Sequence, residues 1–214
     1  MKRTIFLLVS LIVAVGAGAG YFFGFERCQD QLAYDLSPYC LKKNEKSAKN
    51  GDVGAAYNLA LFFEGRDPMK SDAWIRVAAN GGDRRAVSRV LAECGDGKIF
   101  SYEASKQILK KAVQKNAAGF TGDAMEFYLG ASCGPLDLEQ VRKFDPNEID
   151  DDLKLCRVAL RYGQVVEHGE VELQDKRNAN QLLRQCIRKA NPEGETYREA
   201  SRLLRAVGTT NGEN

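Results

Sequence analysis

The chain contains six cysteines, and these are the residues whose type and placement best suit covalent chemistry. They are Cys28, Cys40, Cys94, Cys133, Cys156 and Cys186. A zinc site would need closely spaced pairs such as C-x-x-C or neighbouring histidines, and the sequence has neither. All six cysteines follow an apolar N-terminal segment, and an even number in an exported chain predicts disulfides.

The remaining candidates for chemistry fit plainer roles. His168, the single histidine, lies in a polar stretch typical of an exposed loop between helices. Residues 95–98, Gly-Asp-Gly-Lys, lack the spacing and the Ser or Thr of a phosphate-binding loop. The acidic run at 145–152 has no calcium-loop pattern and suits the start of a helix near Leu153. We therefore expect no catalytic residue, no cofactor and no metal: the protein is predicted not to be an enzyme.

Net charge argues against nucleic acid as a partner. The formal charge is +2, from 31 basic and 29 acidic residues. Lys2 and Arg3 account for the whole excess, so the rest of the chain is neutral. A nucleic-acid-binding domain would be expected to carry a basic excess.

The N-terminal segment predicts export and anchoring. Residues 5–25 carry no charge and are long enough to cross a hydrocarbon core of about 30 Å. Lys2 and Arg3 are expected to keep the preceding end in the cytoplasm. Residues 1–25 are thus predicted to be a signal anchor in the inner membrane, with the C-terminal domain in the periplasm.

A cleaved signal peptide is the alternative for this segment. Ala17 and Ala19 are small residues at suitable positions for cleavage before Gly20. The apolar run continues through 21–25, where a signal peptide normally turns polar, and this favours the anchor. In either case the cysteine-containing part is exported.

Behind this segment, a degenerate repeat predicts an all-α fold. Gly-Asp or Gly-Glu begins at 51, 82, 122 and 194, which suggests a period near 36 residues. Ala-rich segments between these marks carry apolar residues at helical spacing. Each unit is predicted to be a pair of short amphipathic helices that buries its apolar face against the next unit.

The first unit resembles a Sel-one-like repeat, a relative of the tetratricopeptide repeat. The matching positions are Ala55, Leu59, Gly65, Trp74, Ala78, Ala79 and Gly82. Ala60 replaces the usual Gly, Phe63 replaces Tyr, and the turn after Gly65 is shorter than the pattern. Later units match progressively less well. The resemblance implies a short right-handed superhelical array of antiparallel helix pairs at 48–207. A disulfide-bearing juxtamembrane segment at 26–47 is expected before this array, and a disordered tail at 208–214 is expected after it.

The repeat frame also suggests cysteine pairs. Cys94 and Cys133 both occupy the tyrosine position of their units and are each followed by Gly, so they form a column through neighbouring repeats. Cys156 and Cys186 fall on the two helices of the fourth unit, and Cys28 and Cys40 close a short loop beside the membrane. The alternative is that some of these cysteines are simply small buried hydrophobic residues.

The expected function is binding to another protein. Helical arrays bind partners through the first helix of each pair, so contacts are expected from Tyr57, Asn58, Leu61, Arg85, Ser88 and Arg89. The resemblance implies either an immunity protein that blocks a type VI secretion effector, notably a phospholipase, or an envelope scaffold or regulatory adaptor. A hydrolase acting on lipid or cell wall is the alternative class, and the lack of a nucleophile–base pair weighs against it.

Overall fold

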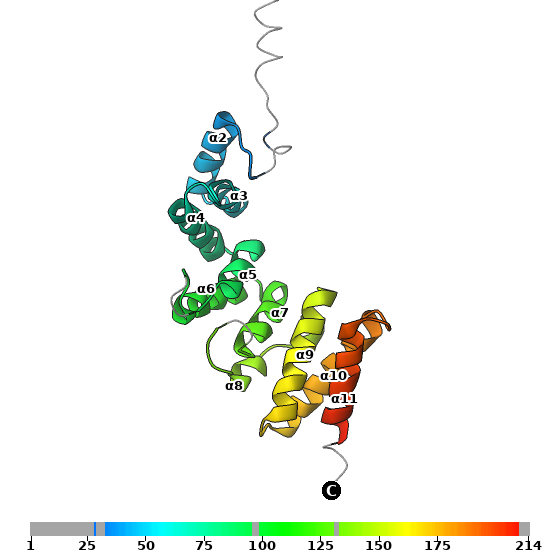
Figure 1. Ribbon diagram of the computed structural model, residues 1–214. Helices are drawn as coiled ribbons and strands as arrows, with labels where there is room; N and C mark the ends of the chain where they lie inside the picture. The colour runs from blue at the N-terminus through cyan, green and yellow to red at the C-terminus, as the bar shows by residue number, and fades with distance from the viewer. Residues whose placement is uncertain (1–27, 29–32, 96–98, 131–132, 210–214) are drawn as a thin grey trace, which may run out of the picture.

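A computed structural model describes residues 28, 33–95, 99–130 and 133–209, and within these ranges the protein is all-α (Figure 1). The helices are α2 (Pro38–Lys49), α3 (Val53–Phe63), α4 (Pro68–Gly81), α5 (Arg84–Ala92), α6 (Tyr102–Lys115), α7 (Ala117–Tyr128), α8 (Leu138–Val141), the 3₁₀ helix η1 (Pro146–Glu148), α9 (Asp152–His168), α10 (Leu173–Lys189) and α11 (Glu195–Thr209). Each long helix packs mainly on its neighbours in the chain, most extensively α3 on α4 and α9 on α10. The predicted sequential helix pairs are therefore confirmed.

Asx residues start the first helix of each unit. The carboxylates of Asp52 and Asp83 and the amide oxygen of Asn116 accept backbone N–H groups at the starts of α3, α5 and α7, and Asp151 does the same for α9. These N-caps lie 31, 33 and 35 residues apart. The prediction that Gly122-Asp123 marks a boundary between units is wrong, because both residues lie inside α7.

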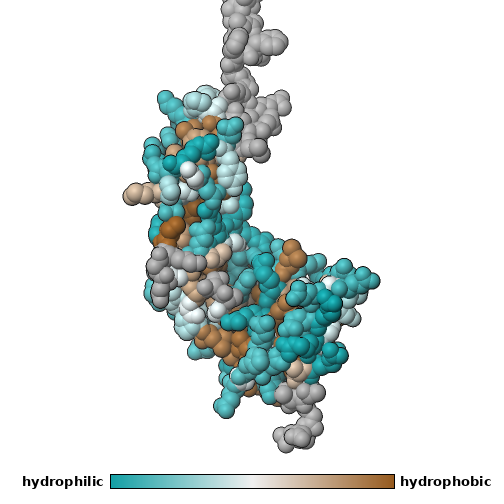
Figure 2. All heavy atoms as spheres, in the orientation of Figure 1, coloured by the Kyte–Doolittle hydropathy of each residue, from teal (hydrophilic) through white to brown (hydrophobic). Residues whose placement is uncertain are grey.

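Small residues allow the first unit to pack closely. Ala55, Leu59, Ala78 and Ala79 are buried between α3 and α4, and Trp74 packs partly buried against them. A single hydrophobic core continues from this unit to Val207 near the end of α11. The surface seen in Figure 2 is mostly hydrophilic, with separate apolar patches.

The third unit departs from the expected helix pair. Its first helix, α7, is followed by the four-residue α8 and by η1. Pro146 opens η1; a proline has no N–H to donate, and it disfavours a helical backbone at the residue before it. The expectation of two helices in every unit is thus wrong here. Where a second helix of the third unit would lie beside α6, the described chain has only α8 and η1.

Three pairs of cysteines lie at disulfide distance, in the pairing suggested by the repeat frame. The Cα atoms are 5.4 Å apart in Cys28–Cys40, 5.5 Å in Cys94–Cys133 and 4.9 Å in Cys156–Cys186. These separations fit disulfide geometry. Three disulfides indicate an oxidising compartment outside the cytoplasm.

The predicted anchor at 1–25 lies outside the described residues. Among the residues that are described, no helix has the length and hydropathy needed to span a bilayer. Helix α2 runs across the boundary expected between residues 47 and 48 and packs on α3. Helix α11 continues to Thr209, so the start of the expected tail is helical, and 210–214 lie outside the described residues.

Candidate protein-binding surface

Three of the six predicted contact residues lie where α3 meets α5. The Arg85 guanidinium stands over the Tyr57 ring, 4.3 Å from its centroid, and pairs with the Asp83 carboxylate at 2.8 Å. Arg89 pairs with Glu64 at 2.7 Å and with Glu93 at 2.9 Å. The structure therefore brings Tyr57, Arg85 and Arg89 together, in contacts that join consecutive first helices.

The other three predicted residues lie elsewhere. The Ser88 hydroxyl donates to Asp123 Oδ1 of α7 at 2.7 Å. Asn58 faces a hollow beside α2 that Lys43 and Ser47 also line. Leu61 is half-buried on α3. The six residues thus divide among separate places along the array.

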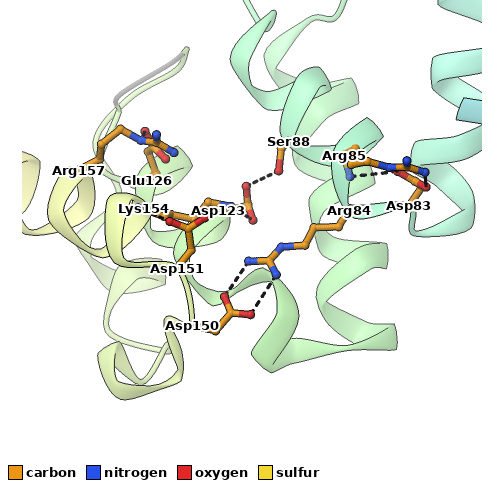
Figure 3. A network of polar contacts seen from close by, with 10 residues as sticks. All are labelled: Asp83, Arg84, Arg85, Ser88, Asp123, Glu126, Asp150, Asp151, Lys154 and Arg157. Carbon is orange, nitrogen blue, oxygen red and sulfur yellow. Dashed lines mark hydrogen bonds and ion pairs between the residues drawn. The ribbon is translucent and has the colours of Figure 1, made fainter. Parts of the chain in front are cut away.

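The first helices α5, α7 and α9 enclose a recess of about 470 Å³ (Figure 3). Asp123 lies at its centre, with 5% of its side chain exposed. Its two carboxylate oxygens accept from different helices, Oδ1 from Ser88 and Oδ2 from Lys154 Nζ at 2.6 Å. Because the Lys154 side chain is only 9% exposed, this ion pair is shielded from water.

A glycine makes room for the buried lysine. A Cβ at position 122 would lie 2.6 Å from Lys154 Cδ and 2.9 Å from Cγ. Gly122 therefore lets the aliphatic part of Lys154 lie against α7, which directs the ammonium to Asp123. The Gly122-Asp123 dipeptide that suggested a turn in the sequence instead lies inside α7, where Gly122 accommodates Lys154 and Asp123 lines the recess.

Exposed ion pairs fix the charges around the recess. Arg84 holds Asp150 through two hydrogen bonds, at 3.0 and 2.8 Å, and Figure 3 shows this bidentate pair below Asp123. The hydrogen bonds raise the pKa of Arg84 and lower the pKa of Asp150. Arg157 Nε lies 3.2 Å from Glu126 on the opposite rim. The rim thus presents groups of both signs in set positions, which suits recognition of a polar protein surface.

A second hollow meets the recess at Arg157. It has a volume of about 440 Å³ and lies between α9 and the segment that leads into α11. Leu153 lines it with 77% of its surface exposed, and Leu160 contributes a second apolar side chain. The recess and this hollow are joined at Arg157, and together they extend over α5, α7 and α9 to the segment between α10 and α11. We call them the first-helix surface.

Sequence reasoning did not single out Arg157 and Leu153, which line this surface. It placed the contacts on α3 and α5 because these helices match the repeat pattern best, whereas α7 and α9 match it weakly. One signal was available: Leu153 and Arg157 are four residues apart, so they share one face of a helix. The sequence alone does not show whether an apolar residue at a helix start is buried or exposed. Only an exposed one indicates a contact surface.

Of the other chemical candidates, His168 lies away from this surface, whereas Cys156 lies within it as half of a disulfide. His168 is 76% exposed at the end of α9 and lies 3.5 Å from Glu167. Within the ranges that the structure describes, no three His, Cys, Asp or Glu side chains converge as metal ligands would. Cys156 lines the second hollow but is paired with Cys186.

Searches against protein-family models, curated proteins and solved structures found no match to this chain. The resemblance to Sel-one-like repeats therefore rests on the sequence positions around Ala55, Trp74 and Gly82. The first-helix surface is defined by geometry alone.

Proposed function

We propose that the protein is a non-catalytic module of the cell envelope that binds another protein through the first-helix surface. In this proposal the helix pairs form a right-handed Sel-one-like superhelix, tethered to the inner membrane by residues 5–25, with the array in the periplasm. The observation that carries the proposal is the continuous recessed surface across α5, α7 and α9, in which exposed Leu153 adjoins the fixed charges of Arg157 and Glu126.

The chemistry of this surface is suited to a protein partner. Arginine is enriched among the residues that dominate binding energy, particularly beside apolar anchors that become buried. A stable interface buries on the order of 1,600 Å² in total, which is more than one helix pair offers. Several consecutive first helices would therefore need to contribute, and residues of three of them line the recess.

The most concrete form of the proposal is an immunity protein that blocks a type VI secretion effector of the phospholipase class in the periplasm. A short, self-contained array held outside the cytoplasm is suited to capture a toxin at its site of action. The second candidate is an envelope scaffold or regulatory adaptor, which would use the same surface for a resident partner.

The test combines capture with survival. Full-length tagged protein is isolated from cells together with any effector encoded beside its gene, and cells lacking the gene are challenged by kin with an active secretion system. We expect one-to-one capture and loss of survival on deletion. The paired change Leu153→Asp and Arg157→Glu should reduce capture at least tenfold, whereas Lys42→Glu, at an exposed position of α2, should not.

Two outcomes separate the candidates. Capture of a resident envelope protein with unchanged survival would replace immunity by the scaffold role. Full capture by the paired variant, with its helical content and unfolding midpoint unchanged, would overturn the first-helix surface as the binding site.

A further inference from the structure

A groove of about 690 Å³ lies on the opposite side of the array, between α6 and the α8–η1 segment. It exists because the second helix of the third unit is replaced by four residues of α8 and three of η1. Figure 2 shows apolar surface in the region of α6 and α8. The groove shares no lining residue with the first-helix surface.

The floor of the groove is apolar. Leu109 and Val113 of α6 face Tyr128 of α7 and Phe144, which follows α8. The Tyr128 and Phe144 rings stack at 6.3 Å with an interplanar angle of 22°. Burial raises the pKa of Tyr128, so its phenol stays neutral and the floor carries no charge at physiological pH. A volume in this range is typical of sites for small molecules.

Lysines line the groove from both sides. Lys106 and Lys110 lie one helical turn apart on α6, and Lys143 faces them from the end of α8. Lys106 stands over the Tyr102 ring at 5.5 Å, and Lys143 is 3.6 Å from exposed Glu139. Among the described residues, the Lys110 ammonium has neither an ion pair nor a side-chain hydrogen bond.

The acidic residues of the groove already have donors. Asp145 Oδ1 accepts from the backbone N–H and the side-chain amide of Asn147, each at 2.9 Å. Glu148 Oε2 accepts from the Thr121 hydroxyl at 2.9 Å. These donors are neutral, so they orient both carboxylates without cancelling their charges. The three lysines of the lining still exceed its two acidic residues by one positive charge, at the edge of an apolar floor.

We propose that this groove binds a single-chain anionic amphiphile, with an aliphatic chain on the apolar floor and a carboxylate or phosphate head between Lys106, Lys110 and Lys143. The chain displaces water from Leu109, Val113 and the two stacked rings. The anionic head pairs with lysines that are otherwise weakly engaged, and this complementarity sets the sign of the ligand's charge. An amphipathic protein helix would use the apolar floor as well, but it would not need the anionic head.

Photocrosslinking of the full chain in its own membranes tests the site. The probe is hexadecanoate with a diazirine on its chain, and mass spectrometry identifies the labelled peptides. We expect labelling of α6 and of the segment around Phe144. Unlabelled hexadecanoate should suppress it, whereas hexadecyltrimethylammonium, which has the same chain and the opposite charge, should not.

Two variants and a control define the result. Lys106→Glu with Lys110→Glu should reduce labelling at least fivefold, and Val113→Trp, which fills the groove, should do the same. Lys42→Glu with Lys43→Glu reverses the same number of lysine charges on α2, at two exposed positions, and should label as the wild type does. Thermal unfolding of each variant identifies any loss of labelling caused by misfolding.

Other outcomes would overturn the proposal. Equal competition by the cationic amphiphile would show that only apolar partitioning is measured. Labelling that is unchanged in both folded groove variants would place the amphiphile elsewhere. Suppression of labelling by a copurifying protein helix crosslinked to α6 would assign the groove to a protein instead.

Discussion

Asp123 is the residue on which consecutive units converge. It lies on α7, accepts from Ser88 of α5 and Lys154 of α9, and is nearly enclosed. Burial of an ion pair gives little net stability, because the desolvation of both charges offsets their attraction. What the pair contributes is specificity: any other register between α7 and α9 would leave a buried charge without a partner.

The first prediction is that Asp123→Asn destabilises the protein by about 3 kcal/mol, the order expected when one member of a buried pair is removed. Lys154 would keep its charge in a site from which water is excluded. The measurement is urea-induced unfolding followed by circular dichroism.

Glu126→Gln provides the matched control for this prediction. It breaks the more exposed pair with Arg157, so it should cost less than about 1 kcal/mol. Lys154→Met in the Asp123→Asn background should recover part of the loss, since no unpaired charge then remains. Equal effects of Asp123→Asn and Glu126→Gln would contradict the buried role of Asp123.

At residue scale, the sequence predicts the buried small residues better than the charged contacts. Ala55, Ala78 and Ala79 are identified correctly because close helix packing requires small side chains at fixed spacing. The Lys154–Asp123 pair is not predictable from spacing, because most Lys and Asp residues in helices face solvent. Only the packing of α7 on α9 decides that these two are buried.

Among the elements, α10 begins at a charged cluster that joins it to α8 and α9. Asp175 in its first turn is fully buried, receives Tyr162 Oη–H at 2.7 Å and is held by Arg142 at 2.7 and 3.0 Å. Burial alone would raise the pKa of Asp175, but the hydrogen bonds from Arg142 and Tyr162 outweigh it and lower the pKa. Burial and the bond to Asp175 also raise the pKa of Tyr162.

The second prediction is a pH dependence that originates at Asp175. Since its pKa is lower in the folded protein than the unfolded value near 3.8, its contribution is fully present above that value and is lost as the pH falls through the folded pKa. Asp175→Asn should therefore cost about 2 kcal/mol at pH 7, where it removes charge-assisted hydrogen bonds. The difference from wild type should narrow below pH 3.8.

Urea unfolding at several pH values measures this dependence. Asp72→Asn, on α4, removes a carboxylate outside the cluster and should follow the wild-type curve. A constant gap between Asp175→Asn and wild type across the acid range would show that the carboxylate of Asp175 is not the titrating group.

The third prediction concerns the disulfide that joins the segments following α5 and α7. Cys94 and Cys133 are 39 residues apart in the sequence, so their bond restricts a long loop in the unfolded chain. Replacing both with Ser should lower the free energy of unfolding by about 2–4 kcal/mol. Thiol titration of denatured, unreduced wild-type protein should detect no free thiol, and six free thiols would refute all three pairs.

Element prediction from this sequence succeeds where helix starts have clear caps. The units starting after Asp52, Asp83 and Asp151 are recognisable from acidic caps followed by apolar periodicity. The third unit is mispredicted because Gly122-Asp123 imitates a cap inside α7, while the functional cap is Asn116. The groove beside α6 could not be predicted, since it depends on how α8 and η1 fold back.

As a whole molecule, the protein is a linear series of helices in which contacts run mainly between neighbours. Figure 1 shows the chain advancing from α2 at one end to α11 at the other. One consequence is that surfaces on opposite sides of the array, such as the first-helix surface and the groove beside α6, can be altered separately.

The last prediction is that the whole array lies outside the cytoplasm. Residues 5–25 are uncharged and follow Lys2 and Arg3, and all six cysteines of the exported part are paired. Disulfides persist where thiols are not kept reduced, so the sequence signal and the structure favour the same compartment. Alkaline phosphatase fused after Asn214 should therefore be active, and deletion of residues 2–25 should abolish that activity.

Fractionation then separates the anchored from the cleaved form: the anchored chain sediments with membranes, whereas cleavage before Gly20 gives a soluble periplasmic product. An inactive phosphatase fusion beside an active cytoplasmic reporter would contradict export in both forms.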